Sequence, residues 1–309
     1  MIVKAITPGF VAEISDIDLC QPLNDEQRDQ IEKEIHTFAV LVFRRQPITP
    51  DQQVAFASRF GPLDTGLQTK LLNKVQTRLG HAALSDISNV NASGEVADRK
   101  HKQTIMTVGN MYWHSDASYE HHPFRYSILS SQAAASWGGH TQFADLRAAY
   151  DSLDERTRDL IRDKTATFYA NYTRDFLGIE DDEAQRRTYP PVRWPMVRTH
   201  PGSGRKVLWV DNKAFKVSGM SVPEGRVLVH ELLEHIGQRE HVYSHSWEAG
   251  DVVMWDNRSV LHRGRRFDLN ERREMRRVST VDDSSSLGEV SFDELPYRWT
   301  VPDNPDKAT

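Results

Sequence analysis

The alternation of apolar and polar positions along this chain predicts short strands separated by amphipathic helices. Residues 10–19 and 39–43 have strand-like patterns, and the second run, Ala-Val-Leu-Val-Phe, is apolar throughout, as in a strand buried on both faces. Residues 24–38 have a helical pattern. This helix is expected to begin with a capping box, because Asn24 is followed three residues later by Gln27.

The rest of the chain alternates in the same way. Further strands are predicted at residues 126–134, 141–143, 197–200, 206–210, 251–255 and 275–281, and further helices at 49–60, 146–153, 155–161 and 223–238. Residues 64–110 are polar and weakly patterned, which indicates flexible or ligand-dependent loops, and residues 175–192 are charged like a surface excursion. No glycine-rich phosphate-binding motif follows a strand, so the pattern favours a distorted β-sandwich decorated with helices over a parallel α/β sheet.

Composition narrows the chemistry that such a fold can carry. The 309 residues include one cysteine, Cys20, so a metal site would need His, Asp or Glu ligands. The net charge of −5 gives no support to a nucleic-acid partner, and no run of about 18 apolar residues suggests a membrane span. Because the first residues lack the apolar core of a signal peptide, the expected compartment is the cytoplasm.

One short motif is suited to holding a metal. His114 and Asp116 are two residues apart, and side chains at this spacing in a strand point to the same face. His262, at the start of a later apolar stretch, is the candidate third ligand. Together they would form a 2-His-1-carboxylate triad, which binds Fe(II) on one face and leaves the opposite positions open. Alone, a His-x-Asp pair is more often structural than metal-binding.

Two arginines follow the candidate triad in an arginine-rich segment. Arg273 and Arg277 are four residues apart in a strand-like stretch, so both side chains can face one cavity. The planar guanidinium group makes paired hydrogen bonds to a carboxylate, which suits a dicarboxylate cosubstrate or an acidic substrate. The other arginines between residues 258 and 277 have the distribution of a solvated basic face.

Several further segments complete a specific set of motifs. These are Phe60-Gly61-Pro62-Leu63, residues 110–116, Gly138-Gly139-His140-Thr141, residues 145–150, Trp255-Asp256-Asn257-Arg258, His262, and Arg272 to Arg277. In these motifs the chain, up to about Asp283, resembles the TauD/TfdA family of Fe(II)- and 2-oxoglutarate-dependent dioxygenases. The resemblance implies one domain over residues 1–309, with a polar tail from about residue 284. The implied fold is mainly β: a double-stranded β-helix (jelly roll, cupin-like) core decorated by α-helices.

The resemblance also implies a role for each matching residue. His114, Asp116 and His262 would bind iron, and 2-oxoglutarate would chelate this iron through its 1-carboxylate and 2-oxo groups. Thr141 and Arg273 would bind the distal carboxylate of 2-oxoglutarate.

Three more residues would serve the primary substrate. Arg277 would bind its acidic head, and Asn110 and Ser118 occupy substrate-facing positions. Dioxygen would be the other cosubstrate and ascorbate a stimulant. The protein is expected to form a homo-oligomer, as many members of this family do.

Within the family, residues 194–206 and 261–266 resemble the branch that cleaves aryloxyacetates more than the taurine branch. The expected reaction is hydroxylation of a small carboxylate, such as 2,4-dichlorophenoxyacetate, beside its ether oxygen. The resulting hemiacetal would break down to a phenol and glyoxylate, with succinate and CO2 as co-products. Two lysines of this branch have weak counterparts, because Glu95 stands at one position and Lys70 matches the other loosely. The role of Arg198 is left open.

Three alternatives remain open from the sequence. A taurine or alkylsulfonate dioxygenase of the same family would release sulfite instead of a phenol. A non-catalytic metal-binding sensor would have no need for Thr141 and Arg273, which anchor a cosubstrate. A zinc hydrolase could use the same three ligands, but it would need a general base beside the metal, and none is evident.

Overall fold

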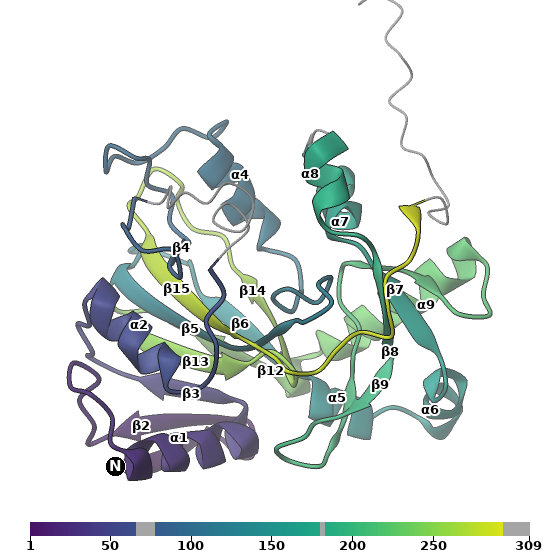
Figure 1. The fold of residues 1–309 in the computed structure, drawn as a ribbon, viewed down its shortest axis with the longest axis horizontal. Helices are drawn as coiled ribbons and strands as arrows, with labels where there is room; N and C mark the ends of the chain where they lie inside the picture. The colour runs from purple at the N-terminus through teal and green to yellow at the C-terminus, as the bar shows by residue number, and fades with distance from the viewer. Residues whose placement is uncertain (66–77, 180–182, 293–309) are drawn as a thin grey trace, which may run out of the picture.

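The computed structural model describes residues 1–65, 78–179 and 183–292, and a seven-stranded sheet forms its largest element (Figure 1). In spatial order its strands are β1 (Ile2–Thr7), β2 (Val11–Ser15), β3 (Val40–Phe43), β13 (Val252–Asp256), β5 (Phe124–Ala133), β15 (Glu274–Val281) and β4 (Ser85–Asp86). Neighbouring strands are antiparallel apart from β2 and β3, which are parallel.

A smaller antiparallel sheet lies against this one and completes the jelly-roll core. Its strands, in spatial order, are β12 (Val242–His245), β6 (Thr141–Asp145) and β14 (Val260–Gly264). Apolar side chains of both sheets form one buried cluster that includes Phe143, Val253, Trp255, Val260 and the loop residue Trp247. The mainly β, helix-decorated fold class predicted from the sequence is therefore confirmed.

Strand β3 is buried on both faces, as its unbroken apolar run predicts. Leu41 and Phe43 pack into the cluster beneath the helices, whereas Val40 and Val42 pack into the cluster between the sheets. All four side chains are inaccessible to solvent. This strand therefore joins two hydrophobic cores and fixes the position of β13, its antiparallel neighbour.

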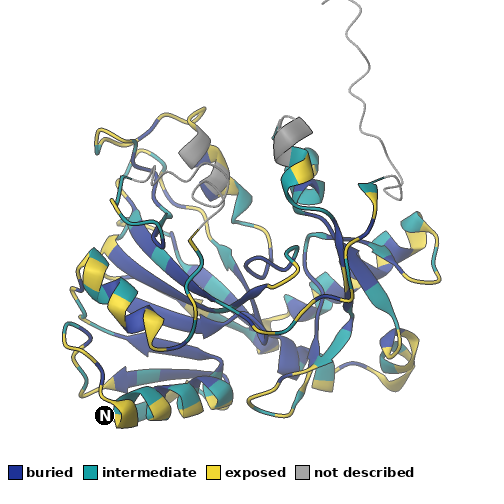
Figure 2. Ribbon diagram, in the orientation of Figure 1, coloured by how far each residue is buried: buried dark blue, intermediate teal, exposed yellow. Residues whose placement is uncertain are grey.

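Two amphipathic helices cover the other face of the large sheet (Figures 1 and 2). They are α1 (Asp25–Phe38), which buries Ile31 and Ile35, and α2 (Pro50–Ser58), which buries Phe56, while their outer faces stay exposed. The predicted capping box of α1 is confirmed, because the side chain of Asn24 accepts a hydrogen bond from the backbone N–H three residues on.

A second group of elements packs beside the jelly roll around its own apolar cluster. It contains the sheet β11 (Ala214–Val217), β7 (Thr165–Phe168) and β8 (Val192–Pro195), the hairpin β9 (Val197–Thr199) and β10 (Lys206–Leu208), and the helices α5 (Leu146–Asp151), α6 (Glu155–Ile161) and α9 (Val222–Ile236), followed by the 3-10 turn η1 (Arg239–His241). The predicted hairpin and the predicted long helix are both present.

Three expectations from the pattern need correction. Strand β1 was not predicted, since its mixed polar and apolar residues remain largely exposed at the sheet edge. The weakly patterned region contains α4 (Lys102–Gly109), and the charged stretch contains α8 (Glu183–Thr188) beside α7 (Ala170–Phe176). Helix α7, for example, begins after Tyr169, whose side chain makes no capping hydrogen bond, so the sequence carries no start signal there.

The described residues 285–292, at the start of the expected polar tail, form backbone hydrogen bonds with the second group of elements. The N–H of Leu287 donates to the carbonyl of Arg193 at 2.8 Å, and the N–H of Val290 donates to that of Pro191 at 2.7 Å. The chain after β15 thereby crosses from the large sheet to the edge of β8 (Figure 1). This crossing ties the two packed groups of elements together.

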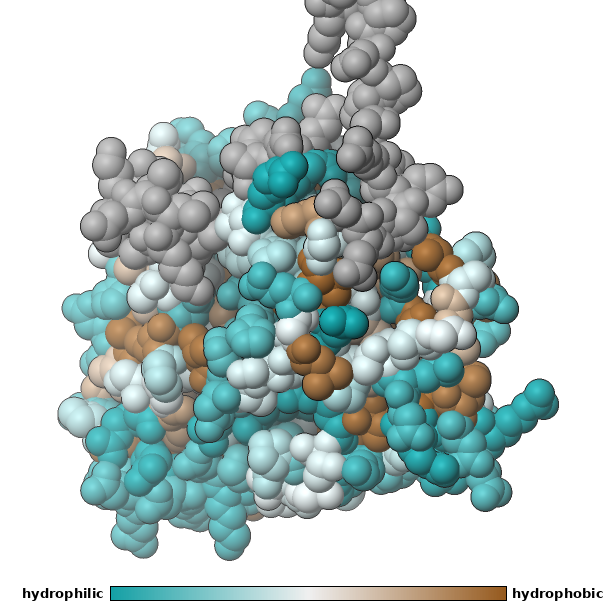
Figure 3. Space-filling view, turned by 45° about the vertical axis from the view of Figure 1, so that its right-hand side comes forward, coloured by the Kyte–Doolittle hydropathy of each residue, from teal (hydrophilic) through white to brown (hydrophobic). Residues whose placement is uncertain are grey.

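Among the described helices, none combines the length and the apolar character that a bilayer crossing requires. On the face drawn in Figure 3, hydrophilic residues predominate and hydrophobic residues are dispersed in small groups.

Candidate metal and cosubstrate site

The two candidate histidine ligands are held together by their own backbones. The N–H of His114 donates to the carbonyl of His262 at 3.1 Å, and the reverse bond measures 2.9 Å. Their ring centroids are 4.2 Å apart. Since His262 belongs to β14 at the centre of the fold, this isolated bridge fixes His114 relative to the jelly roll.

The carboxylate of Asp116 completes the cluster. Its Oδ1 lies 3.9 Å from Nε2 of His114, and its Oδ2 lies 3.7 Å from Nε2 of His262. All three side chains are buried, and their candidate ligand atoms lie within 4.8 Å of one another. The chain forms no regular strand here and turns at Ala117 (φ 55°), so the strand spacing that suggested this convergence is not its cause.

The protonation of both histidines suits a metal. Nδ1 of His114 lies 2.7 Å from the carbonyl of Tyr112, which can only accept, so Nδ1 carries the proton and Nε2 keeps a free lone pair. Burial lowers the pKa of His114, and burial lowers the pKa of His262 to about 4. Both rings are therefore neutral at pH 7, which is the state that binds a metal.

Hydrogen bonds orient the Asp116 carboxylate. The hydroxyl of Ser127 donates to Oδ2 at 2.8 Å, and Nδ2 of Asn257 donates to the Ser127 oxygen at 2.9 Å. Burial alone would raise the pKa of Asp116. The charge of Arg277 and the neighbouring histidines outweigh this effect and hold the pKa well below its usual range. The carboxylate is therefore ionised and aimed at the histidines.

This donor set fits Fe(II). Two neutral imidazole nitrogens and one carboxylate on a single face match the facial triad of non-haem iron oxygenases, and no thiolate is present to favour a softer metal. His114, Asp116 and His262 are the residues that would hold the ion.

A small cavity of about 50 Å³ adjoins the triad on the side of Thr141 and Arg273; we call it the cosubstrate lobe. The Arg273 guanidinium is buried here. Among the described residues it has no carboxylate partner and reaches only two carbonyls, of Ile87 and Gly139, both at 3.4 Å. Burial lowers its pKa to about 10, which leaves it charged at pH 7. A buried cation without an anion fits the distal carboxylate of 2-oxoglutarate.

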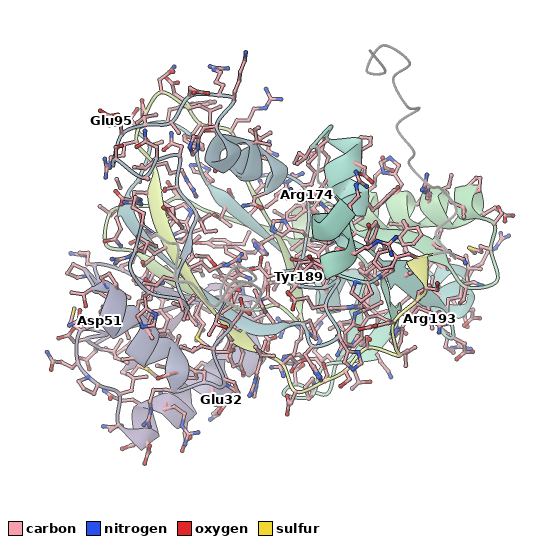
Figure 4. All side chains as sticks on the ribbon, turned by 45° about the horizontal axis from the view of Figure 1, so that its top comes forward. Glu32, Asp51, Glu95, Arg174, Tyr189 and Arg193 are labelled. Atoms are coloured by element: carbon pink, nitrogen blue, oxygen red, sulfur yellow. The ribbon has the colours of Figure 1, made fainter. Side chains whose placement is uncertain are left out.

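A larger cavity of about 400 Å³ adjoins the triad on the side of Asp116; we call it the substrate lobe. Helices α4 and α7 contribute to its wall, together with Tyr189 and Arg174, which Figure 4 shows on the same side of the molecule. Arg277 and Asn110 line both lobes. They therefore lie where a substrate would meet the metal and its cosubstrate.

The other described residues that the sequence suggested for substrate binding lie outside the two lobes. The Ser118 hydroxyl donates to Asp211 at 2.6 Å, and Ser118 lines neither lobe, so the geometry gives no support to a substrate-facing role. Glu95 is at the outer edge of the molecule (Figure 4), and Arg198 stacks on Trp194 and Trp209.

Lys70 lies outside the described residues. Sequence reasoning missed Ser127, although a polar residue in the buried stretch Tyr126-Ser127-Ile128 is a recognisable signal of a specific hydrogen bond.

A jelly-roll core with a 2-His-1-carboxylate cluster, beside a buried arginine that lacks an anion, defines the class of non-haem iron oxygenases that use a 2-oxo acid. Comparison with known proteins identifies the family. The model of the family described as "Taurine catabolism dioxygenase TauD, TfdA family" matches residues 2–279. The chain therefore belongs to the TauD/TfdA family, and it is a 2-oxoglutarate-dependent dioxygenase that uses Fe(II) and dioxygen.

Individual relatives agree with this placement. The chain is 47% identical over 285 residues to an alpha-ketoglutarate-dependent 2,4-dichlorophenoxyacetate dioxygenase of Cupriavidus pinatubonensis, covering 92% of this chain and 99% of the relative. It is 35% identical over 244 residues to an (S)-phenoxypropionate/alpha-ketoglutarate-dioxygenase of Delftia acidovorans, covering 75% and 78%. The crystal structure of AAD-2 with Mn(II) and N-oxalylglycine aligns with a TM-score of 0.85 and 37% identity, covering 94% of this chain and 100% of that one.

Proposed function

We propose that this enzyme hydroxylates a small aryloxyacetate, such as 2,4-dichlorophenoxyacetate, and thereby cleaves its ether bond to a phenol and glyoxylate. The observation that carries the proposal is the position of Arg277. Its guanidinium lies at the junction of the two lobes, beside the metal-ligand carboxylate of Asp116, where it would hold an acidic substrate next to the metal. Close similarity to an enzyme named for that substrate supports this choice.

The substrate lobe has walls that suit an aryl ring. Tyr119 and Tyr189 form a T-shaped pair with centroids 5.0 Å apart, and Phe124, Leu177 and Ile179 add apolar surface. A phenoxy group would bury its faces there while its carboxylate pairs with Arg277.

In this arrangement the residues of the chain position the reactants, and the bound cofactor carries out the reaction. Bound iron, with 2-oxoglutarate and dioxygen, supplies the oxidising power that inserts one oxygen atom into a C–H bond. Thr141 and Arg273 would hold the distal carboxylate of 2-oxoglutarate, and Arg277 would hold the substrate carboxylate. Arg277 would then place the carbon between the substrate's carboxylate and its ether oxygen towards the metal ligands. Hydroxylation at that carbon gives a hemiacetal, which breaks down to a phenol and glyoxylate.

A substrate screen tests the proposal. Purified enzyme with Fe(II), 2-oxoglutarate and ascorbate would be supplied with aryloxyacetates, 2-aryloxypropionates and alkylsulfonates including taurine. Succinate formation stimulated by an aryloxyacetate, with equimolar release of a phenol, is expected. Stimulation by sulfonates alone, with release of sulfite, would instead establish the taurine-type reaction. Assembly into a homo-oligomer and a cytoplasmic location remain predictions, which size-exclusion chromatography and cell fractionation would check.

A further inference from the structure

We propose that Trp247 is a positioning residue for the cosubstrate: its indole N–H holds the Thr141 hydroxyl so that the hydroxyl proton points into the cosubstrate lobe. Nε1 of Trp247 donates to Oγ1 of Thr141 at 2.9 Å. Both residues are buried, with 7% and 4% of their surface exposed, so water does not replace this contact. The inference rests on the proposed binding of 2-oxoglutarate by Thr141 and Arg273.

The donors and acceptors of the two side chains determine where the Thr141 hydroxyl proton can point. An indole N–H can only donate, so Thr141 must be the acceptor in this contact. A threonine hydroxyl has one proton and two lone pairs, and the Trp247 bond occupies one lone pair. The hydroxyl proton therefore remains available, and Thr141 lines the same cavity as the buried guanidinium of Arg273. Both groups can then donate to one carboxylate.

The position of Trp247 is fixed by packing. It follows β12, whose residue His245 is the register partner of Thr141 on β6. The Trp247 ring packs edge-on against His245, with centroids 4.5 Å apart, and belongs to the cluster between the two sheets. The indole is thus held by the same strand pairing that places Thr141, and little side-chain freedom has to be lost when the cosubstrate binds.

Polarisation would strengthen this arrangement further. A hydroxyl that accepts a hydrogen bond becomes a better donor, because successive hydrogen bonds polarise one another in a buried setting. Loss of the Trp247 N–H would leave the Thr141 hydroxyl free to rotate and weaken it as a donor. The effect should be restricted to ligands that have a distal carboxylate.

Isothermal titration calorimetry on the Mn(II)-loaded protein tests this inference with two ligands. One is 2-oxoglutarate, and the other is 2-oxovalerate, which has the same chain length and no distal carboxylate. Trp247→Phe should weaken 2-oxoglutarate binding about five-fold, the usual effect of one neutral hydrogen bond, and leave 2-oxovalerate binding unchanged. In a Thr141→Val background the same substitution should have no further effect.

Trp209→Phe is the matched control. Trp209 is also buried, but its Nε1 has no hydrogen-bond partner among the described residues, so binding of both ligands should stay at the wild-type level. Replacement of Trp247 by benzothienylalanine, which removes the N–H and keeps the ring shape, provides a second variant if Trp247→Phe does not fold.

The outcomes separate this inference from the proposed function. Unchanged 2-oxoglutarate affinity in the Trp247 variants, or equal loss for both ligands, would overturn the positioning role. If the wild-type protein itself showed no preference for 2-oxoglutarate over 2-oxovalerate, the binding role of Thr141 and Arg273 would fail instead.

Discussion

Nη1 of Arg277 lies 2.5 Å from Oδ1 of Asp116, so the arginine proposed to bind the substrate also neutralises a metal-ligand carboxylate. The ion pair is mostly buried, with 19% of the arginine side chain and 6% of the aspartate side chain exposed. A substrate carboxylate that binds Arg277 therefore joins an existing charge pair. If Arg277 binds the substrate as proposed, substrate binding and the electrostatics of the metal site are coupled through this one guanidinium.

Substitution of Arg277 should affect the substrate far more than the cosubstrate. Arg277→Met removes the cation at the junction of the lobes, and kcat/KM for the aryloxyacetate should fall by roughly 100-fold, as expected for loss of a buried charge partner. Steady-state assays of succinate formation measure kcat/KM for the aryloxyacetate and KM for 2-oxoglutarate. Arg273→Met should show the opposite pattern, with the larger change in KM for 2-oxoglutarate, and exposed Arg266→Lys serves as the control. An exchange of the two patterns would mean that the roles of the two arginines are reversed.

Removal of a triad residue should abolish metal binding. His262→Ala leaves two ligands that cannot hold Fe(II) at micromolar concentration, so Mn(II) binding by calorimetry and succinate formation should both disappear. His230→Ala, at an exposed position of α9, should bind Mn(II) like the wild type. Retention of full turnover by His262→Ala would contradict the assignment of the ligand.

The hydrogen bond from Ser127 to Asp116 should contribute to metal affinity. Ser127→Ala removes a donor to Oδ2 and should weaken Mn(II) binding about ten-fold, the lower end of the range for such supporting groups. Ser118→Ala is the informative comparison, because its hydroxyl binds Asp211 instead of the ligand carboxylate. Ser118→Ala should lower the melting temperature and leave Mn(II) affinity near the wild-type value. Equal Mn(II) affinity for the wild type and Ser127→Ala would exclude the supporting role.

The metal-free protein should lose stability as the pH falls from 7 towards 4. The pKa of His262 is lowered by burial to about 4, below its unfolded value of about 6.5, so the unfolded state takes up protons that the folded state does not. The free energy of unfolding, measured by urea denaturation, must then decrease with pH in this window. His262→Gln should show a shallower dependence. A dependence in the variant as steep as in the wild type would contradict this account.

Arg147 should be essential for stability, although it lines neither lobe. It is 1% exposed, pairs with Asp145 at 2.9 Å, and donates to the carbonyls of Gly9, His36 and Thr37. Arg147→Met should lower the free energy of unfolding by about 3 kcal/mol, because it leaves a buried carboxylate without its partner.

The matched control for this prediction is Arg162→Met, which breaks an exposed pair with Asp159 and should change the free energy of unfolding by less than about 0.5 kcal/mol. Similar urea midpoints for the two variants would show that the buried pair has no special weight.

Hydrophobic patterning was sufficient to predict the long helices and strands, but it did not predict the helices in polar segments. Helix α1 was predicted with its cap, since a period of 3.6 residues repeats over 14 residues and Asn24 marks its start. Helix α4 was not predicted, because it lies within the polar, weakly patterned residues 64–110. The shorter helices α5 and α6 were predicted, and each begins at a capping aspartate, Asp145 and Asp154.

The site residues were predicted from a different kind of information. Thr141 and Arg273 were proposed through family motifs, and the structure brings both beside the histidine cluster. The contact between Trp247 and Thr141 joins positions 106 residues apart, so no local pattern could indicate it. The spacing argument for His114 and Asp116 assumed a strand where the chain forms a single bridge and a turn.

The two lobes differ in what builds their walls. The Thr141 side belongs to the paired strands of the core, whereas the substrate lobe is walled in part by α4, α7 and the segment around Tyr189, outside both jelly-roll sheets. For enzyme engineering, this means that part of the substrate lobe can be altered separately from the cosubstrate lobe. A combinatorial library confined to α7 and the segment around Tyr189 would vary substrate selectivity while leaving the metal ligands and the lining of the cosubstrate lobe unchanged.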